Sequence, residues 1–277
     1  ATFTGLVFWV MPTLAFTHAS GALAGGSWAA IAAASPFARG ALFVATGLFG
    51  VLALAAVAEL ARVGEGTPFP WDPPRRLVRT GPYAYVANPM QLGACALVML
   101  LAVATQSWFL VLAGISSIVF SEAIAHPHER ATLATRWPEY ADHTRSVRAW
   151  LPRWRPAPVT GRLWVSEECA VCQDFGAALA VVTPLAGGTP QAGGVPLSVL
   201  AAEDAPAALS RMRWEGAGVV DDGVAAFARA IEQTNLAAAW LGWLIRLPGV
   251  RSVIQIVVDA CGLEPQLAVR DVTGPHR

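Results

Sequence analysis

Two cysteines, Cys169 and Cys172, have the CxxC spacing of a redox-active thiol pair. A strand-like apolar stretch at residues 162–166 precedes them and a helical pattern follows. A helix N-terminus stabilises a thiolate, so Cys169 is the expected attacking nucleophile and Cys172 would resolve the mixed disulfide. Glu167 and Glu168 act against this by like charge, and we therefore predict mild reactivity. Zinc needs four donors, and no second cysteine pair lies nearby.

A second group of ionisable residues, Glu122, His126, His128 and Glu129, lies at the end of an apolar segment. Ionisable groups close to lipid are usually functional or paired. An interfacial salt bridge from Glu129 to an arginine and a role in ligand binding fit the sequence equally well. The spacing of these donors is not that of a helical zinc motif, and we predict no metal site.

The composition indicates a membrane protein. Of the 277 residues, 55 % are hydrophobic and 14 % are charged, and the mean hydropathy is +0.49, which is too apolar for an ordinary soluble protein. The sequence contains no lysine, so all 19 cationic side chains are arginines, and the formal net charge is zero. No basic block is present, which argues against a nucleic-acid partner.

Four apolar segments predict an α-helical transmembrane bundle of about four spans, at residues 3–16, 40–58, 89–105 and 108–121. A helix needs about 20 residues to cross the hydrocarbon core, so the second segment fits easily and the others need flanking residues. A signal peptide is the competing interpretation of the first segment, although a basic N-terminal region is missing. Arginines concentrate at residues 62–79 and after residue 121, which predicts that both stretches and both termini are cytoplasmic.

Residues 64–93 form a polar, proline-rich, arginine-bearing segment between two of these apolar runs. Backbone that is neither helix nor closed barrel persists at membrane depth only where protein buries it or where it lines a wet cavity. We therefore expect a binding site in this segment. Asn88-Pro89 is typical of a helix start, with Asn88 as the cap. A plain helix start with tyrosines in an interfacial belt is the alternative.

The stretch LVRTGPYAYVANPMQLG, followed by an apolar hairpin and by HERATLATRWPEYADHTRSVRAWLPRWRP, resembles the isoprenylcysteine carboxyl methyltransferase and phospholipid methyltransferase group of integral membrane enzymes. The likeness covers residues 42–156. It implies that the chain binds S-adenosylmethionine at the cytoplasmic membrane face and methylates a lipophilic acceptor.

The resemblance and the chemistry of the methyl donor together suggest the site residues. The predicted cofactor-binding residues are Arg79, Gly81, Tyr83, Tyr85, Asn88, Pro89, Met90, Gly93 and Glu129. Glu129 suits the donor's amino group or ribose, Arg79 its carboxylate, and a tyrosine its sulfonium or adenine. An acceptor that must lose a proton needs a base, for which His128 and His143 are the candidates. His128 stands with Cys169 and Cys172 as a predicted catalytic residue.

The chain departs from the family pattern at several positions, including Pro138 in place of a glycine. Ala87 stands where arginine is usual, Gln91 where many members have tyrosine, and Arg130 where the second glutamate of a pair belongs. These departures are compatible with a degenerate or repurposed methyl-donor pocket.

The second half of the chain is similar to thioredoxin-like proteins. Its tail resembles the small thiol–disulfide oxidoreductases named for an Asp-Cys-Cys signature, with Glu168 in place of the aspartate. We predict a strand at 195–200, a helix at 205–212, a hairpin turning around Asp221-Asp222-Gly223, and a helix at 225–234. Residues 240–261 predict two amphipathic helices broken at Leu247-Pro248, with a fifth span as the alternative.

The sequence thus predicts a multi-domain protein, with a transmembrane methyltransferase-like domain at residues 1–156 and a cytosolic α/β thioredoxin-like domain at residues 161–277. The predicted function is S-adenosylmethionine-dependent methylation of a membrane lipid or a lipophilic small molecule. A thiol reductant or thiol substrate is the expected partner of the CxxC pair. The alternatives are a membrane-anchored thiol–disulfide oxidoreductase with a degenerate first half, and a lipid-binding scaffold.

Overall fold

A computed structural model describes residues 28–67, 74–157, 161–166, 174–179, 198–201, 204–205, 209 and 211–262. Within the described helices, the side chains of residues 124, 125, 128 and 129 are outside this description. The chain divides into two compact units. The first comprises Ala1–Val78 and Val86–Leu151, and the second comprises Arg79–Tyr85 and Pro152–Arg277. The predicted domain boundaries at residues 156 and 161 stay predictions.

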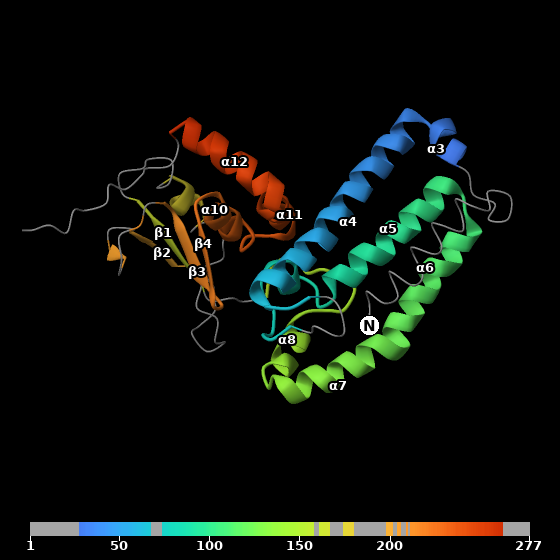
Figure 1. Cartoon of the computed structure of the whole chain (residues 1–277), viewed down its shortest axis with the longest axis horizontal. Coiled ribbons are helices and arrows are strands. Elements are labelled where there is room, and N and C mark those ends of the chain that lie inside the picture. The colour runs from blue at the N-terminus through green and yellow to red at the C-terminus, as the bar shows by residue number, and fades with distance from the viewer. Residues whose placement is uncertain are drawn as a thin grey trace, which may run out of the picture. The chain divides into compact units, whose positions relative to one another are not determined.

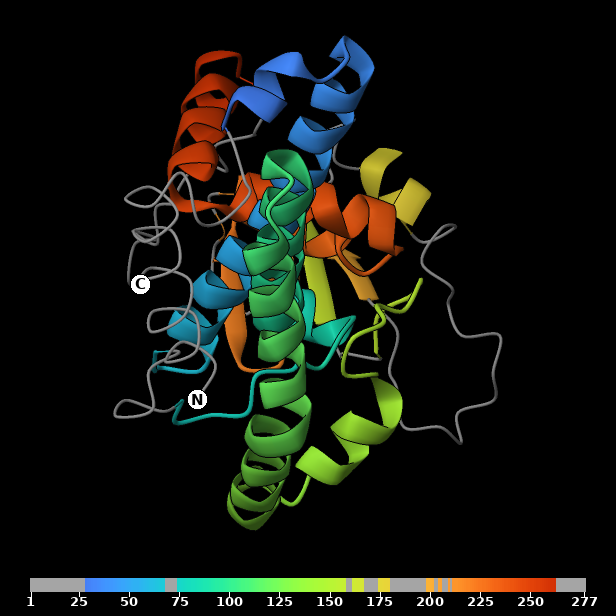
Figure 2. The same ribbon diagram turned by 90° about the vertical axis from the view of Figure 1, so that its right-hand side faces the viewer.

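The first unit is helical in its described part. Its elements are α3 (Trp28–Ala33), α4 (Pro36–Val63), α5 (Pro89–Thr105), α6 (Trp108–Phe120), the π-helical turn η3 (Ser121–Ala125), α7 (His126–Arg136) and α8 (Tyr140–Ser146). Helix α5 lies between α4 and α6 (Figures 1 and 2). Caps and prolines set these boundaries. The Ser35 hydroxyl accepts from the Ala38 amide ahead of α4, and the Ser107 hydroxyl does the same for the Leu110 amide in α6.

Helix α4 is the one helix in the described ranges that is long and apolar enough to cross a membrane by itself. Helix α5 and residues Trp108–Ala123 are apolar but shorter. The helical hairpin predicted at residues 89–121 is present, while the four-span count stays a prediction and residues 3–16 lie outside the described residues. Large apolar side chains on α4 and α6 are exposed, among them Phe37, Phe43, Leu54, Leu112, Ile115 and Val119. Such surfaces suit lipid better than water.

The second unit contains a small mixed sheet. Its strands are β1 (Gly161–Val165), β2 (Ser198–Ala201), β3 (Arg213–Gly216) and β4 (Val219–Asp222), in the order β2-β1-β3-β4. Strands β1 and β2 are parallel, and the other two pairs are antiparallel. Apolar residues of the sheet, including Leu163 and Trp214, pack against Ala226 and Ala230 of helix α10 (Val224–Ile231; Figure 1). Residues 174–179 are also helical.

Two further helices complete this unit. Helices α11 (Leu236–Arg246) and α12 (Pro248–Ala260) meet at Leu247 with a bend of 86°. Asn235 caps α11 through the Ala238 amide, and Pro248 opens α12. The prediction of two helices broken at Leu247-Pro248 is therefore confirmed. The 3₁₀ turn η2 (Gly81–Ala84) also belongs to the second unit.

Two local predictions in this unit were wrong. The hairpin turns at Ala217-Gly218, whose φ angles of 49° and 75° suit a type I′ turn, and the Asp221-Asp222 pair belongs to β4. Asp222 remains in the strand because it pairs with Arg213 of β3, whose Nε lies 2.6 Å from the carboxylate. The helix predicted at 205–212 is not found among the described residues of that range. The predicted strand at 195–200 and helix at 225–234 correspond to β2 and α10 with shifted ends.

Candidate functional site

The predicted site residues fall in several parts of the chain. Asn88, Pro89, Met90 and Gly93 lie at the start of α5 in the first unit, while Arg79, Gly81, Tyr83 and Tyr85 belong to the second unit. The backbones of His128 and Glu129 lie in α7, but their side chains are outside the description. Cys169 and Cys172 also lie outside the described residues. Their roles stay predictions.

Asn88 occupies the N-cap position of α5 but makes no side-chain capping bond. Its amide instead reaches His126, with 2.6 Å between Asn88 Nδ2 and His126 Nε2. One helical turn along α5, Gln91 approaches the same imidazole, with its Oε1 atom 2.7 Å from Nε2. Residues three apart on a helix share one face, so the two amides converge on one ring nitrogen.

The other side of the imidazole faces Glu122. The Glu122 Oε1 atom lies 2.9 Å from His126 Nδ1, and the Trp150 indole N–H donates to the same carboxylate. The Trp150 ring lies 5.8 Å from the imidazole, centroid to centroid. Glu122 lies within the π-helical turn η3, and His126 is the first residue after this turn. Single π-helical turns inside α-helices often mark functional positions, and here the turn places Glu122 and His126 together.

The imidazole is buried, with 3 % of the residue exposed, whereas the Glu122 side chain is 48 % exposed. In one tautomer the ring hydrogen is on Nδ1 and faces Glu122, and Nε2 accepts from the Asn88 amide. In the other tautomer the hydrogen is on Nε2 and faces the Gln91 carbonyl oxygen. Glu122 thus gives the site a charged edge open to its surroundings. Within the described ranges, no group of three or more His, Cys, Asp or Glu residues could hold a metal ion.

Gln91 carries the clearest sign of a missing ligand. The residue is 4 % exposed, and its Nε2 atom has no hydrogen-bond partner among the described residues. A buried amide donor left without a partner costs about 1–3 kcal/mol. Natural proteins keep few such groups, and each calls for an explanation. An acceptor atom of a bound molecule would supply the missing partner.

Gly93 and Gly81 have clear structural roles. A Cβ atom on Gly93 would lie 2.9 Å from Ala53 Cβ and 3.0 Å from the Phe49 carbonyl oxygen, so glycine allows α4 and α5 to pack closely. Gly81 has a φ of 59°, which glycine adopts without strain, at the start of η2.

The side chains around this turn differ in exposure. Arg79 is exposed and Tyr83 half-buried, so both are accessible to a ligand. Tyr85 is fully buried and donates its hydroxyl hydrogen to the Glu232 carbonyl.

Comparison with known proteins concerns the first part of the chain. Residues 36–137 match the phospholipid methyltransferase family. No curated protein and no solved structure matches the chain. The match includes the start of α5, the π-helical turn and His126, and it ends before the region that resembles thioredoxin-like proteins. The match supports a membrane methyltransferase of lipid-like substrates. Members of this family normally use S-adenosylmethionine. We refer to residues 36–137 as the methyltransferase-like region.

The sequence did not indicate the contacts of His126 with Asn88, Gln91 and Glu122. The sequence indicates the ionisable cluster but suggests His128 and His143 as the base, and His143 lies buried in α8. In the sequence Gln91 stands out only as a departure from the family's usual tyrosine, whereas in the structure its amide contacts His126. The three-residue spacing of Asn88 and Gln91 was the available signal. Nothing in the local pattern indicates that Trp150 joins them.

Proposed function

We propose that the protein is an S-adenosylmethionine-dependent methyltransferase that acts on a lipophilic or lipid-linked acceptor at the cytoplasmic membrane face. The unpartnered, buried amide of Gln91 in the polar cluster at the start of α5 carries the proposal. The family match over residues 36–137 and the exposed apolar faces of α4 and α6 support it. The arginine-rich stretches around the apolar segments support the cytoplasmic orientation.

The residues present suit the polar parts of the donor. S-adenosylmethionine presents a carboxylate, an ammonium group, a sulfonium and an adenosine, and when bound it supplies an electrophilic methyl group. Gln91 Nε2 offers a hydrogen-bond donor to a carboxylate or a ribose hydroxyl. From the chemistry of the donor, Arg79 is the proposed partner of the carboxylate, and Glu129 is the proposed partner of the ammonium group or the ribose.

His126 has a positioning role in this proposal. Its Nε2 atom either accepts a hydrogen bond from the Asn88 amide or donates one to the Gln91 carbonyl oxygen, and Glu122 faces the far side of the ring. Methyl transfer is an in-line displacement whose rate depends on alignment and exclusion of water more than on a strong base. A carboxylate acceptor would need no base. An amine, thiol or hydroxyl acceptor would pass its proton to a base, for which His128 remains the proposed residue.

Donor binding tests the proposal. Calorimetry on the full chain in lipid nanodiscs should detect S-adenosylmethionine binding, and Gln91→Leu should weaken it at least tenfold. Gln106→Asn is the matched control, because Gln106 ends α5 in a left-handed conformation that asparagine tolerates. Wild-type protein that fails to bind at millimolar donor would end the methyltransferase proposal. Transfer of a labelled methyl group into lipid extracts would then identify the acceptor class.

A second activity, thiol–disulfide exchange by the C-terminal unit, has one observation in its favour. The strand order β2-β1-β3-β4 with β1 and β2 parallel agrees with a thioredoxin-like arrangement, and the CxxC pair follows β1 in sequence. Insulin reduction by wild-type protein, lost in Cys169→Ser with Cys172→Ser, would support this activity. Absence of turnover in the wild type would reject it.

A further inference from the structure

The turn that carries Gly81, Pro82 and Tyr83 is built into the C-terminal unit. Residues Arg79–Tyr85 lie within the methyltransferase-like region, yet they belong to the same compact unit as Pro152–Arg277. Gly81, Pro82 and Ala84 are buried in η2, and helix α11 packs against this turn. The partners that hold the turn therefore come from beyond the family-matched residues.

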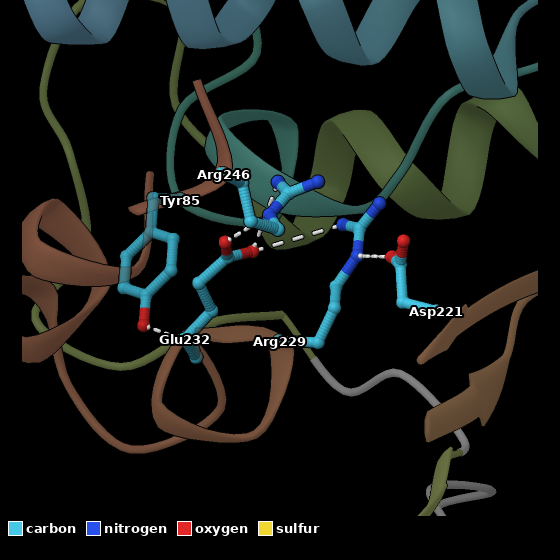
Figure 3. A network of polar contacts seen from close by, with 5 residues as sticks. All are labelled: Tyr85, Asp221, Arg229, Glu232 and Arg246. Carbon is cyan, nitrogen blue, oxygen red and sulfur yellow. Dashed lines mark hydrogen bonds and ion pairs between the residues drawn. The ribbon is translucent and has the colours of Figure 1, made fainter. Parts of the chain in front are cut away.

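Tyr85 is the anchor of this turn. It is fully buried, its hydroxyl donates to the Glu232 carbonyl oxygen over 2.6 Å, and its ring meets the Trp243 ring edge-on at 5.5 Å (Figure 3 shows the hydroxyl contact). Glu232 ends α10, and Trp243 lies in α11. A buried tyrosine with its hydroxyl bonded to a fixed carbonyl gives both apolar packing and one defined orientation.

Backbone hydrogen bonds hold the turn from its other side. The Arg153 amide donates to the Tyr85 carbonyl over 3.0 Å, and the Ala157 amide donates to the Ala84 carbonyl over 2.7 Å. The Trp154 carbonyl accepts in turn from the Leu236 amide at the start of α11, over 2.8 Å. Residues 153–157 thus connect the turn to α11.

A buried network of ion pairs fixes Glu232, whose backbone carbonyl accepts the hydrogen bond from the Tyr85 hydroxyl. The Glu232 carboxylate lies 2.6 Å from Arg246 Nε and 3.7 Å from Arg229 Nη1, and Arg229 Nε lies 2.8 Å from Asp221 (Figure 3). All four side chains are buried. Their alternating charges join β4, α10 and α11. Because burying charges costs desolvation energy, the network fixes the relative positions of these elements more than it adds to the stability of the fold.

We infer that Tyr85 is a positioning residue through which the folded C-terminal unit holds the Gly81–Tyr85 turn in the conformation that binds the methyl donor. This inference rests on the proposed function, because the turn is assigned to the donor site by family resemblance. Loss of the hydroxyl loosens the turn but leaves binding of the methyl acceptor unchanged. The donor KM then rises while kcat changes little.

Hydrogen–deuterium exchange on the full chain in nanodiscs tests the inference with Tyr85→Phe, which keeps the ring and removes one hydrogen bond. Tyr140→Phe makes the same chemical change in α8 and is the control. We expect exchange in peptides covering residues 79–86 to accelerate about tenfold, while peptides from α10 and α11 keep their protection. Donor affinity should fall about tenfold in parallel.

The outcomes separate the two proposals. Unchanged exchange at residues 79–86 would overturn the inference whatever the donor does. Faster exchange with unchanged donor affinity would show that the turn lies outside the donor site, and would also overturn it. If exchange is faster in Tyr85→Phe but the wild-type protein binds no donor, the anchoring of the turn stands and the methyltransferase function is rejected.

Discussion

The Tyr85 hydroxyl donates to the backbone carbonyl of Glu232, a residue 147 positions later in the chain. Burial, and secondarily the negative charge of Glu232, raise the pKa of the Tyr85 phenol above its ordinary range. The hydroxyl therefore stays protonated, and remains a hydrogen-bond donor, at neutral and mildly alkaline pH.

The raised pKa of Tyr85 predicts the response to alkali. An unfolded tyrosine loses its proton near pH 10, whereas the folded chain retains it, so the unfolded state binds fewer protons above that pH. The contribution of Tyr85 to stability is complete below pH 10 and is lost as the pH rises through the folded-state value. In an ultraviolet titration, one of the three phenols should ionise only together with unfolding. That late step should be missing in Tyr85→Phe, and its persistence there would contradict the assignment.

Gln91→Leu should separate stability from binding. The substitution removes an unpartnered buried amide and also a contact with His126, so the two changes oppose each other. We expect the free energy of unfolding to change by less than about 1 kcal/mol, while donor affinity falls. Thermal melts read by tryptophan fluorescence supply the first quantity. A large loss of stability would mean that the amide serves the fold and has no ligand.

The buried ion network should be sensitive to the loss of a single member. Arg246→Met leaves the Glu232 carboxylate buried with Arg229 Nη1 at 3.7 Å, and we expect a destabilisation of about 3–5 kcal/mol. Arg251→Met changes a half-buried arginine of α12 and is the control. Denaturant unfolding of both variants measures the difference. Adding Glu232→Leu to Arg246→Met should recover part of the loss, since the buried carboxylate is then gone.

Gly93→Ala should weaken the packing of α4 on α5. The added methyl group would lie 2.9 Å from Ala53 Cβ, closer than real Cβ contacts allow, and we expect a loss of about 1–3 kcal/mol. Gly47→Ala in α4 is the matched control, because nothing lies within 4 Å of its added Cβ. Melting temperatures of the two variants give the comparison. Equal stability would show that the helices can separate without cost at Gly93.

Elements defined by local chemistry could be predicted closely. Pro89 starts α5 and Pro248 starts α12 at the predicted residues, because proline at a first helical position signals a helix start. The turn predicted at Asp221-Asp222-Gly223 was wrong, although these residues have the composition of a turn. Ion pairs with Arg213 and Arg229 hold the two aspartates in a strand.

The site depended on contacts that no local pattern contains. Asn88 looks like a cap, and only the fold shows its amide directed to His126. Tyr85 looks like a ligand-facing residue next to Tyr83, and only the second unit reveals what buries it. Pairs separated by 38 or 147 residues cannot be read from spacing.

The anchoring of the Gly81–Tyr85 turn also has a consequence for biosynthesis. A ribosome adds about 5–20 residues per second, so the 147 residues that separate Tyr85 from Glu232 take roughly 7–30 s to make. Helix α4 has been made when that interval begins, and α5 and α6 are made early in it, whereas the Glu232 carbonyl that accepts from the Tyr85 hydroxyl is made last. The methyltransferase-like region of a nascent chain thus stays unfinished until the C-terminal unit has emerged and folded.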